Sequence, residues 1–256
     1  MTEINGTNNV SGVNNTKPGS AFIKFCTDAH LQYLLLALLL YAIKALLYFA
    51  IAGIPTTVHV FNMEIDKHIP FCKYMYVFYF SYYILPEIML WRLSFYDKRK
   101  FFNLFFAIIM ANIICCICFI LYQVKMIRQP GYPMDITLAD IKSVSDLFDY
   151  AVSFQYKADS TALNCFPSLH AVMGMAVVLL GLRLRRNEGD FPLWCRILCV
   201  VFGAGIVVST VMIKQHYFID SVAGCVLLVI TFVISGIILK KCMEGNTRFA
   251  KLLRDK

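Results

Sequence analysis

The sequence predicts an all-α membrane protein built as a bundle of six transmembrane helices. Of its 256 residues, 59% are apolar and only 16% are charged, whereas a soluble domain is nearer half apolar and a quarter charged. The apolar residues also form runs of about 20, the length at which an α-helix crosses a bilayer. Basic residues gather in the short segments between the runs, which is typical of cytoplasmic loops.

Six apolar runs are candidate spans. In chain order they are residues 31–53, 73–93, 102–123, 169–185, 193–213 and 218–239. The fourth is short, which allows a tilt or an extension at either end. Residues 1–25 are rich in Asn, Thr, Ser and Gly, so we expect a disordered polar tail before the membrane domain. That domain covers residues 26–243, and a basic cytoplasmic tail follows over 244–256.

The loops set the orientation of the bundle. A net charge of +8 in a soluble protein suggests nucleic acid, but here the charge marks one side of a membrane. The basic residues that share this side are Arg92, Lys98, Arg99, Lys100, Arg183, Arg185, Arg186, Lys240, Lys241, Arg248, Lys251, Arg254 and Lys256. Because positive loops stay inside, we expect both termini to be cytoplasmic. Segments 54–72, 124–168 and 214–217 then lie outside, in a membrane that the short loops suggest is a bacterial plasma membrane.

Two ionisable residues interrupt the apolar runs, Lys44 in the first and Glu87 in the second, beside Pro86. Intramembrane ionisable residues are functional candidates by default. A lysine can nevertheless extend its ammonium to the interface, and Glu87 is expected near the cytoplasmic boundary. We therefore interpret both residues as structural.

The long outer segment has a helical pattern of its own. Leu138, Ile141, Val144, Leu147 and Phe148 recur at helical spacing. We interpret this stretch as a helix that lies on the membrane surface or caps the bundle. Two outer cysteines, Cys72 and Cys165, would form a disulfide only if the fold brings them together.

Two strings of residues contain candidate chemistry. One is Asn164-Cys165-Phe166-Pro167-Ser168-Leu169-His170, and the other runs from Ser209 to His216 and Asp220. In the six-span topology, His170 opens the fourth span, His216 follows the fifth and Asp220 opens the sixth. Arg128 follows the third span. All four side chains are therefore expected at one level, on the outer face of the membrane.

These side chains suit phosphoryl transfer. An imidazole is a nucleophile toward phosphorus, and a carboxylate can support it. Asp220 is four residues after His216, so the two share a face if this segment is helical. A second histidine can protonate the leaving alcohol, while Arg128 and Ser168 can bind phosphate. Two histidines and an aspartate also resemble a zinc site. No further ligand is evident, so we expect no metal and no cofactor.

At these strings the sequence resembles the type-2 phosphatidic acid phosphatase superfamily, which includes lipid phosphate phosphatases, sphingolipid synthases and soluble haloperoxidases. The resemblance is best over residues 120–240. In the first family segment a lysine is followed by six residues and then by Arg-Pro. Here Lys125, Arg128 and Pro130 match in part, with Gln129 inserted. The resemblance implies that Arg128, and with it Lys125, binds phosphate.

The second and third segments match more closely. Pro-Ser-Gly-His is Pro167-Ser168-Leu169-His170 here, which implies that Ser168 binds phosphate and His170 is the leaving-group acid. The third family segment reads Ser-Arg, five residues, His, three residues and Asp, and residues 209–220 match its spacing. The resemblance implies that His216 is the nucleophile and Asp220 its partner.

Two departures from the family pattern bear on the substrate. Leu169 replaces glycine and Thr210 replaces an arginine that clamps phosphate. Both replacements are similar to inositol-phosphorylceramide synthases and to a group of bacterial membrane homologues, which Asn164 also matches. Lys214 is a candidate to supply the lost charge, although two residues from His216 it can face another side.

The resemblance implies a membrane-bound lipid phosphatase that works through a phosphohistidine without metal. Its substrate would be a phospholipid, or an isoprenoid or sphingolipid phosphate, taken from the bilayer, and nucleic acid is not an expected partner. Two alternatives stay open. One is a lipid phosphotransferase that passes the phosphoryl group to an alcohol, and the other is a non-catalytic lipid transporter or scaffold.

Overall fold

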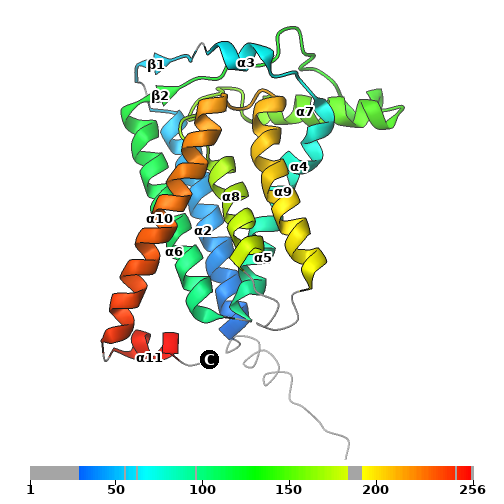
Figure 1. The fold of residues 1–256 in the computed structure, drawn as a ribbon. Coiled ribbons are helices and arrows are strands. Elements are labelled where there is room, and N and C mark those ends of the chain that lie inside the picture. The colour runs from blue at the N-terminus through cyan, green and yellow to red at the C-terminus, as the bar shows by residue number, and fades with distance from the viewer. Residues whose placement is uncertain are drawn as a thin grey trace, which may run out of the picture.

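The structure, a computed structural model, describes residues 29–54, 56–61, 63–95, 97–183, 192–245 and 247–254. The predicted polar tail over residues 1–25 therefore lies outside the described residues. In the described part the chain is mostly helical, as the sequence predicted, and helices packed side by side form the body of the molecule (Figure 1).

The bundle consists of α2 (Ala29–Ala52), α4 (Tyr76–Ser81), α5 (Leu85–Ser94), α6 (Lys98–Leu121), α8 (Leu169–Arg183), α9 (Leu193–Met212) and α10 (Phe218–Glu244). Within the described ranges, four of these helices, α2, α6, α9 and α10, are long and apolar enough to cross a membrane. Helix α8 is apolar but shorter. The four helices indicate an integral membrane protein.

The second predicted span, residues 73–93, is not one helix. A 3₁₀ turn η1 (Lys73–Met75) leads into α4, and a turn through Tyr82 separates α4 from α5. Pro86 explains the break, because proline lacks the N–H that would bond to Tyr82 and its ring clashes with that carbonyl. Pro86 instead occupies the first turn of α5, where no N–H is needed. The residues of this predicted span therefore form two successive helices in the structure.

A layer of shorter elements covers one end of the bundle. Strand β1 (Val58–His59) pairs in parallel with β2 (Gln123–Val124), and α3 (Glu64–His68), η2 (Leu138–Asp140) and α7 (Val144–Ala158) follow the same end. Figure 1 shows α7 lying across the ends of the bundle helices. Ser143 caps α7 by accepting a hydrogen bond from the Asp146 N–H at 3.2 Å. We call this set of elements the end layer.

The opposite end carries α11 (Arg248–Arg254) within the basic tail. Phe249 packs on Phe102 of α6, with ring centroids 5.3 Å apart. The C-terminal segment is therefore folded onto the bundle as far as residue 254.

Helices α8 and α9 touch backbone to backbone. A Cβ atom added to Gly203 would lie 2.6 Å from the carbonyl oxygen of Gly174, and one added to Gly174 would lie 2.8 Å from that of Gly203. Small residues permit such contacts between membrane helices. Where α8 meets α10, Gly224 leaves room for the carbonyl of Ser168, which would lie 2.5 Å from an added Cβ. These glycines let α8 pack closely against both α9 and α10.

Candidate active site

Two imidazoles that are 46 residues apart in sequence meet under the end layer. His170 lies in the first turn of α8, and His216 lies in the turn between α9 and α10. His216 Nε2 is 3.3 Å from His170 Nδ1. The His216 side chain is buried and that of His170 is partly buried. The structure thus places together the two histidines on which the sequence hypothesis depends.

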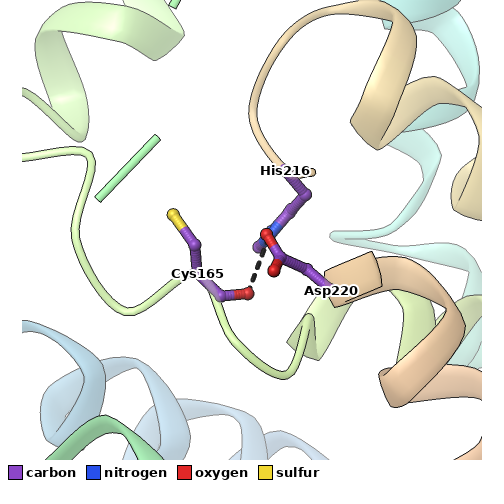
Figure 2. Close-up of side chains that lie close together, drawn as sticks. All are labelled: Cys165, His216 and Asp220. Atoms are coloured by element: carbon purple, nitrogen blue, oxygen red, sulfur yellow. Dashed lines mark hydrogen bonds and ion pairs between the residues drawn. The ribbon is translucent and has the colours of Figure 1, made fainter. Parts of the chain in front are cut away.

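The hydrogen bonds of His216 define its tautomer. Its Nδ1 is 3.0 Å from the backbone carbonyl of Cys165 and 3.6 Å from Asp220 Oδ2. Because a carbonyl can only accept, Nδ1 carries the proton. The Nε2 lone pair then faces His170, in the position from which a nucleophile would act. Figure 2 shows the Cys165 carbonyl pointing at the imidazole, with the Asp220 carboxylate beside it.

Asp220 supports this arrangement from the start of α10. Its Oδ2 accepts a hydrogen bond from the Tyr217 N–H at 2.8 Å, and the carboxylate is fully buried. The backbone of Asp220 also accepts a bond from the Ser168 N–H at 3.0 Å. One residue therefore connects the His216 turn to the beginning of α8, and its charge can stabilise an imidazolium at His216.

The donors Cys165, His216 and Asp220 lie within 4.8 Å of one another, close enough to consider a metal ion. A cysteine binds metal as its thiolate, but burial raises the pKa of the Cys165 thiol well above its usual range. The thiol also donates to the carbonyl of Ala162 at 3.3 Å. In Figure 2 it points away from His216. The geometry fits a hydrogen-bonded cradle in which Cys165 contributes its backbone.

We expect the Cys165→Ala protein to keep close to the wild-type rate of phosphate release, because the backbone carbonyl that orients His216 remains. A metal ligand would behave differently, since disturbing a metal site lowers activity by roughly 10–100-fold. The measurement is the initial rate with and without a chelator. A large loss in the variant, or inhibition by the chelator, would favour the metal interpretation.

A cavity of about 380 Å³ opens beside the histidine pair, and both histidines line it. Its aromatic wall consists of Tyr41, Tyr48, Tyr76, Tyr79, Tyr82, Tyr83, Phe49, Phe80 and Phe154. The three phenylalanines are 50–60% exposed and form an apolar rim, whereas Tyr79, Tyr82 and Lys44 are buried. Such a cavity can hold a polar headgroup while an apolar chain stays at the rim.

His170 is held by aromatic rings. The centroid of its imidazole lies 4.6 Å from that of Tyr79 and 4.1 Å from that of Tyr82. Its Nε2 is buried and has no hydrogen-bond partner within the described residues. The free nitrogen and the stacked ring leave His170 able to exchange a proton with a ligand in the cavity.

Arg128 is engaged by a carboxylate at the cavity wall. Its Nη2 lies 3.0 Å from Asp159 Oδ2, also bonds to the Asp159 backbone carbonyl, and its guanidinium covers the Tyr156 ring at 4.5 Å. Burial raises the pKa of the Asp159 carboxyl, and the Arg128 charge partly offsets this. Asp159 lines the cavity but Arg128 does not. Arg128 therefore acts on the cavity through Asp159 in this structure.

The other sequence candidates are dispersed. Ser168 is buried, and its Oγ accepts from the Ala171 N–H at 3.2 Å as a cap of α8. Asn164 lines the cavity and donates to the Tyr48 carbonyl at 2.8 Å. Lys125 is exposed and does not line the cavity. Lys214 donates to the Ile69 carbonyl at 2.6 Å, on the side of the first outer segment.

Cys72 and Cys165, whose pairing the sequence left open, are both free thiols.

The tyrosines and Lys44 are site residues that sequence reasoning did not select. A usable signal was present: Tyr41, Lys44 and Tyr48 are spaced i, i+3, i+7, which places them on one face of α2. A face with two hydroxyls and an ammonium inside an apolar run is unusual for a surface that contacts only lipid.

One protein family matches this chain. The pattern described as PAP2 superfamily covers residues 33–234, which is most of the chain and includes every residue that lines the cavity. No curated protein and no solved structure gives a significant match.

Proposed function

Because this chain belongs to the PAP2 superfamily, the type-2 phosphatidic acid phosphatases that its motifs resembled, we propose that it hydrolyses a phosphorylated lipid with His216 as the nucleophile. Membership itself indicates phosphatase- or phosphotransferase-type activity on phosphorylated substrates. The lipid, the covalent intermediate and the roles of single residues are the proposal.

The reaction has two steps. The Nε2 lone pair of His216 attacks phosphorus and forms an N–P bond, while the bond from phosphorus to the lipid oxygen breaks and that oxygen takes a proton from His170. His170 begins the reaction protonated and is neutral after this first step. It then accepts a proton from a water molecule, and the oxygen of that water attacks phosphorus. The N–P bond then breaks, which releases inorganic phosphate and restores both histidines.

The contact between His216 Nε2 and His170 Nδ1 at 3.3 Å supports this proposal most strongly. A nucleophile and an acid that serve the same phosphorus must lie within reach of one ligand. Nδ1 of His216, bonded to the Cys165 carbonyl, keeps the attacking nitrogen unprotonated. Asp220 balances the positive charge that forms on the ring after attack.

The experiment is an activity screen with purified protein in lipid vesicles. Candidate substrates are phosphatidic acid, phosphatidylglycerol phosphate, undecaprenyl pyrophosphate, and ceramide together with phosphatidylinositol. We expect inorganic phosphate to be released from at least one lipid phosphate, at the same rate with a chelator, and a His170→Gln variant to release it far more slowly. Failure to release or transfer phosphate from any of them would leave a transporter or scaffold as the function.

One observation favours transfer to an alcohol as the second candidate. Six tyrosines line the cavity next to the histidines, and their hydroxyls can donate to and accept from a polyol acceptor such as inositol. Both reactions share the N–P intermediate, and only the second step differs. Label recovered in a new lipid, with no inorganic phosphate, would identify the transferase.

A further inference from the structure

Lys44 occupies an unusual place for a lysine. It lies within α2, it is 6% exposed, and it lines the same cavity as His170 and His216. Among the lysines and arginines that the structure describes, it alone lines this cavity. An ammonium inside a membrane helix is costly unless it has partners, so its contacts decide whether the charge is structural or available.

The contacts leave Lys44 partly unsatisfied. Its Nζ donates one hydrogen bond, to the Tyr82 hydroxyl at 2.8 Å, and lies over the rings of Tyr41 and Tyr82 at 4.4 Å and 4.7 Å. An ammonium has three N–H donors. No carboxylate of the described chain lies within ion-pair distance; Glu87 is the nearest candidate and shares only a second, small cavity of about 10 Å³ with it. Two donors therefore stay free for a ligand.

Tyr82 links this ammonium to the histidine pair. Its hydroxyl bonds to Lys44, and its ring lies 4.1 Å from the His170 ring, which in turn contacts His216. The turn that separates α4 from α5 places Tyr82 at this point. One side chain thus fixes both the position of the cation and the orientation of the proton-transferring histidine.

The cavity otherwise lacks a positive side chain for a phosphate. Arg128 does not line the cavity; its Nη2 is paired with Asp159, and its Nη1 is buried without a hydrogen-bond partner in the described residues. Lys214 is bonded to the backbone carbonyls of Asp66 and Ile69. Thr210, at the position where the related motif has arginine, bonds to Ser221 at 2.9 Å and is fully buried. Among the described lysines and arginines, Lys44 is therefore the cation that a phosphate in this cavity would meet directly.

We propose that Lys44 is the anion-binding residue of the cavity: its ammonium, positioned by Tyr82, binds the oxygens of the substrate phosphate. The identity of that phosphate as a lipid ester rests on the proposed function, whereas anion binding by Lys44 does not. The bound anion uses the free N–H donors and neutralises the charge, so binding is favoured in the low-dielectric surroundings of the cavity.

The test measures binding of inorganic phosphate to the purified full chain by calorimetry. We expect Lys44→Met to weaken binding about tenfold or more, as loss of hydrogen bonds to a charged group does. Lys44→Arg should restore most of the affinity because it keeps the charge. Lys67→Met is the matched control, since Lys67 is exposed and pairs with Glu64, and its phosphate affinity should equal that of the wild type.

The phosphate affinity of Tyr82→Phe provides a second test if Lys44→Met does not fold. The ring against His170 remains while the hydrogen bond to Lys44 is lost, so phosphate affinity should fall. Equal phosphate affinity in wild type, Lys44→Met and Tyr82→Phe would overturn the inference, as would a wild-type protein that binds no phosphate.

A structural role alone predicts a different pattern. If Lys44 only balances Glu87, then Lys44→Met and Glu87→Gln would each lower thermal stability, the double variant would regain it, and phosphate affinity would stay constant; that result also overturns the inference. Lys44-dependent phosphate binding by a protein that hydrolyses no lipid would support the inference and refute the proposed function. Lipid hydrolysis by a protein whose phosphate binding does not depend on Lys44 would support the proposed function and overturn the inference about Lys44.

Discussion

Replacing His216 by alanine is expected to lower the rate of phosphate release by about 10⁶-fold, the scale of loss when the covalent nucleophile of a serine protease is removed. The reason is geometric: a hydrogen bond to Nδ1 leaves the lone pair on the Nε2 of His216, and that nitrogen faces His170. The measurement is single-turnover release of phosphate from the lipid identified in the screen.

The matched control is His68→Ala. His68 is exposed in α3 and its Nδ1 contacts only the Glu64 backbone carbonyl, at 2.9 Å, so this variant should retain the wild-type rate. Wild-type enzyme quenched with alkaline denaturant should also carry label on His216 after reaction with a phosphorus-labelled lipid. A His216→Ala protein with full activity would show that the mechanism is wrong.

Replacing Gly203 by valine is expected to destabilise the protein by roughly 3 kcal/mol or more, at or above the usual cost of overpacking. Any Cβ at this position would lie 2.6 Å from the Gly174 carbonyl and 2.8 Å from the Val178 N. Both are backbone atoms, so α8 and α9 must separate. Activity should fall as well, because the first helix carries His170 and the second leads to His216.

Thermal unfolding in detergent and the rate of phosphate release measure the two effects. Gly236→Ala provides the control, since its added Cβ lies 3.6 Å from the nearest atoms, which belong to the flexible side chain of Asn103. A Gly203→Val protein with wild-type melting temperature and activity would contradict the close contact between the helices.

The meeting of the two histidines was predictable from the sequence. It depended only on which end of the bundle each loop occupies, and the apolar runs decide that. The break at Pro86 did not disturb the argument, because α4 and α5 follow one another from one end of the bundle to the other (Figure 1). Hydropathy predicts the direction in which a segment crosses the bundle better than it predicts a local break in a helix.

The partner of His216 Nδ1 was not predictable. The sequence suggested Asp220, four residues later on one helix face, but α10 begins at Phe218. His216 therefore lies outside the helix, and the i, i+4 spacing does not apply to it. The closer partner is a backbone carbonyl, a group that every residue has, so no sequence pattern marks it.

Charge pairing was equally hidden from sequence. Arg128 has a family motif and Lys44 has none, yet Arg128 pairs with Asp159 outside the cavity lining while Lys44 lines the cavity. Ion pairs depend on distances between segments, here 31 residues apart for Arg128 and Asp159. The polar face of α2 was readable, but its orientation toward the histidines required the packed bundle.

The parallel pairing of β1 with β2 has a consequence for how the nucleophile can be reached. In the stretch that follows α6, the Lys125 N–H donates to the His59 carbonyl and the Met126 N–H donates to the Ala162 carbonyl. The Val124 carbonyl accepts a hydrogen bond from the Cys165 N–H at 3.3 Å. Cys165 is the residue whose carbonyl sets the His216 proton. The partly exposed segment 56–61 is thus connected to the His216 ring through three hydrogen bonds. We expect a ligand that binds this surface to affect His216 without entering the cavity.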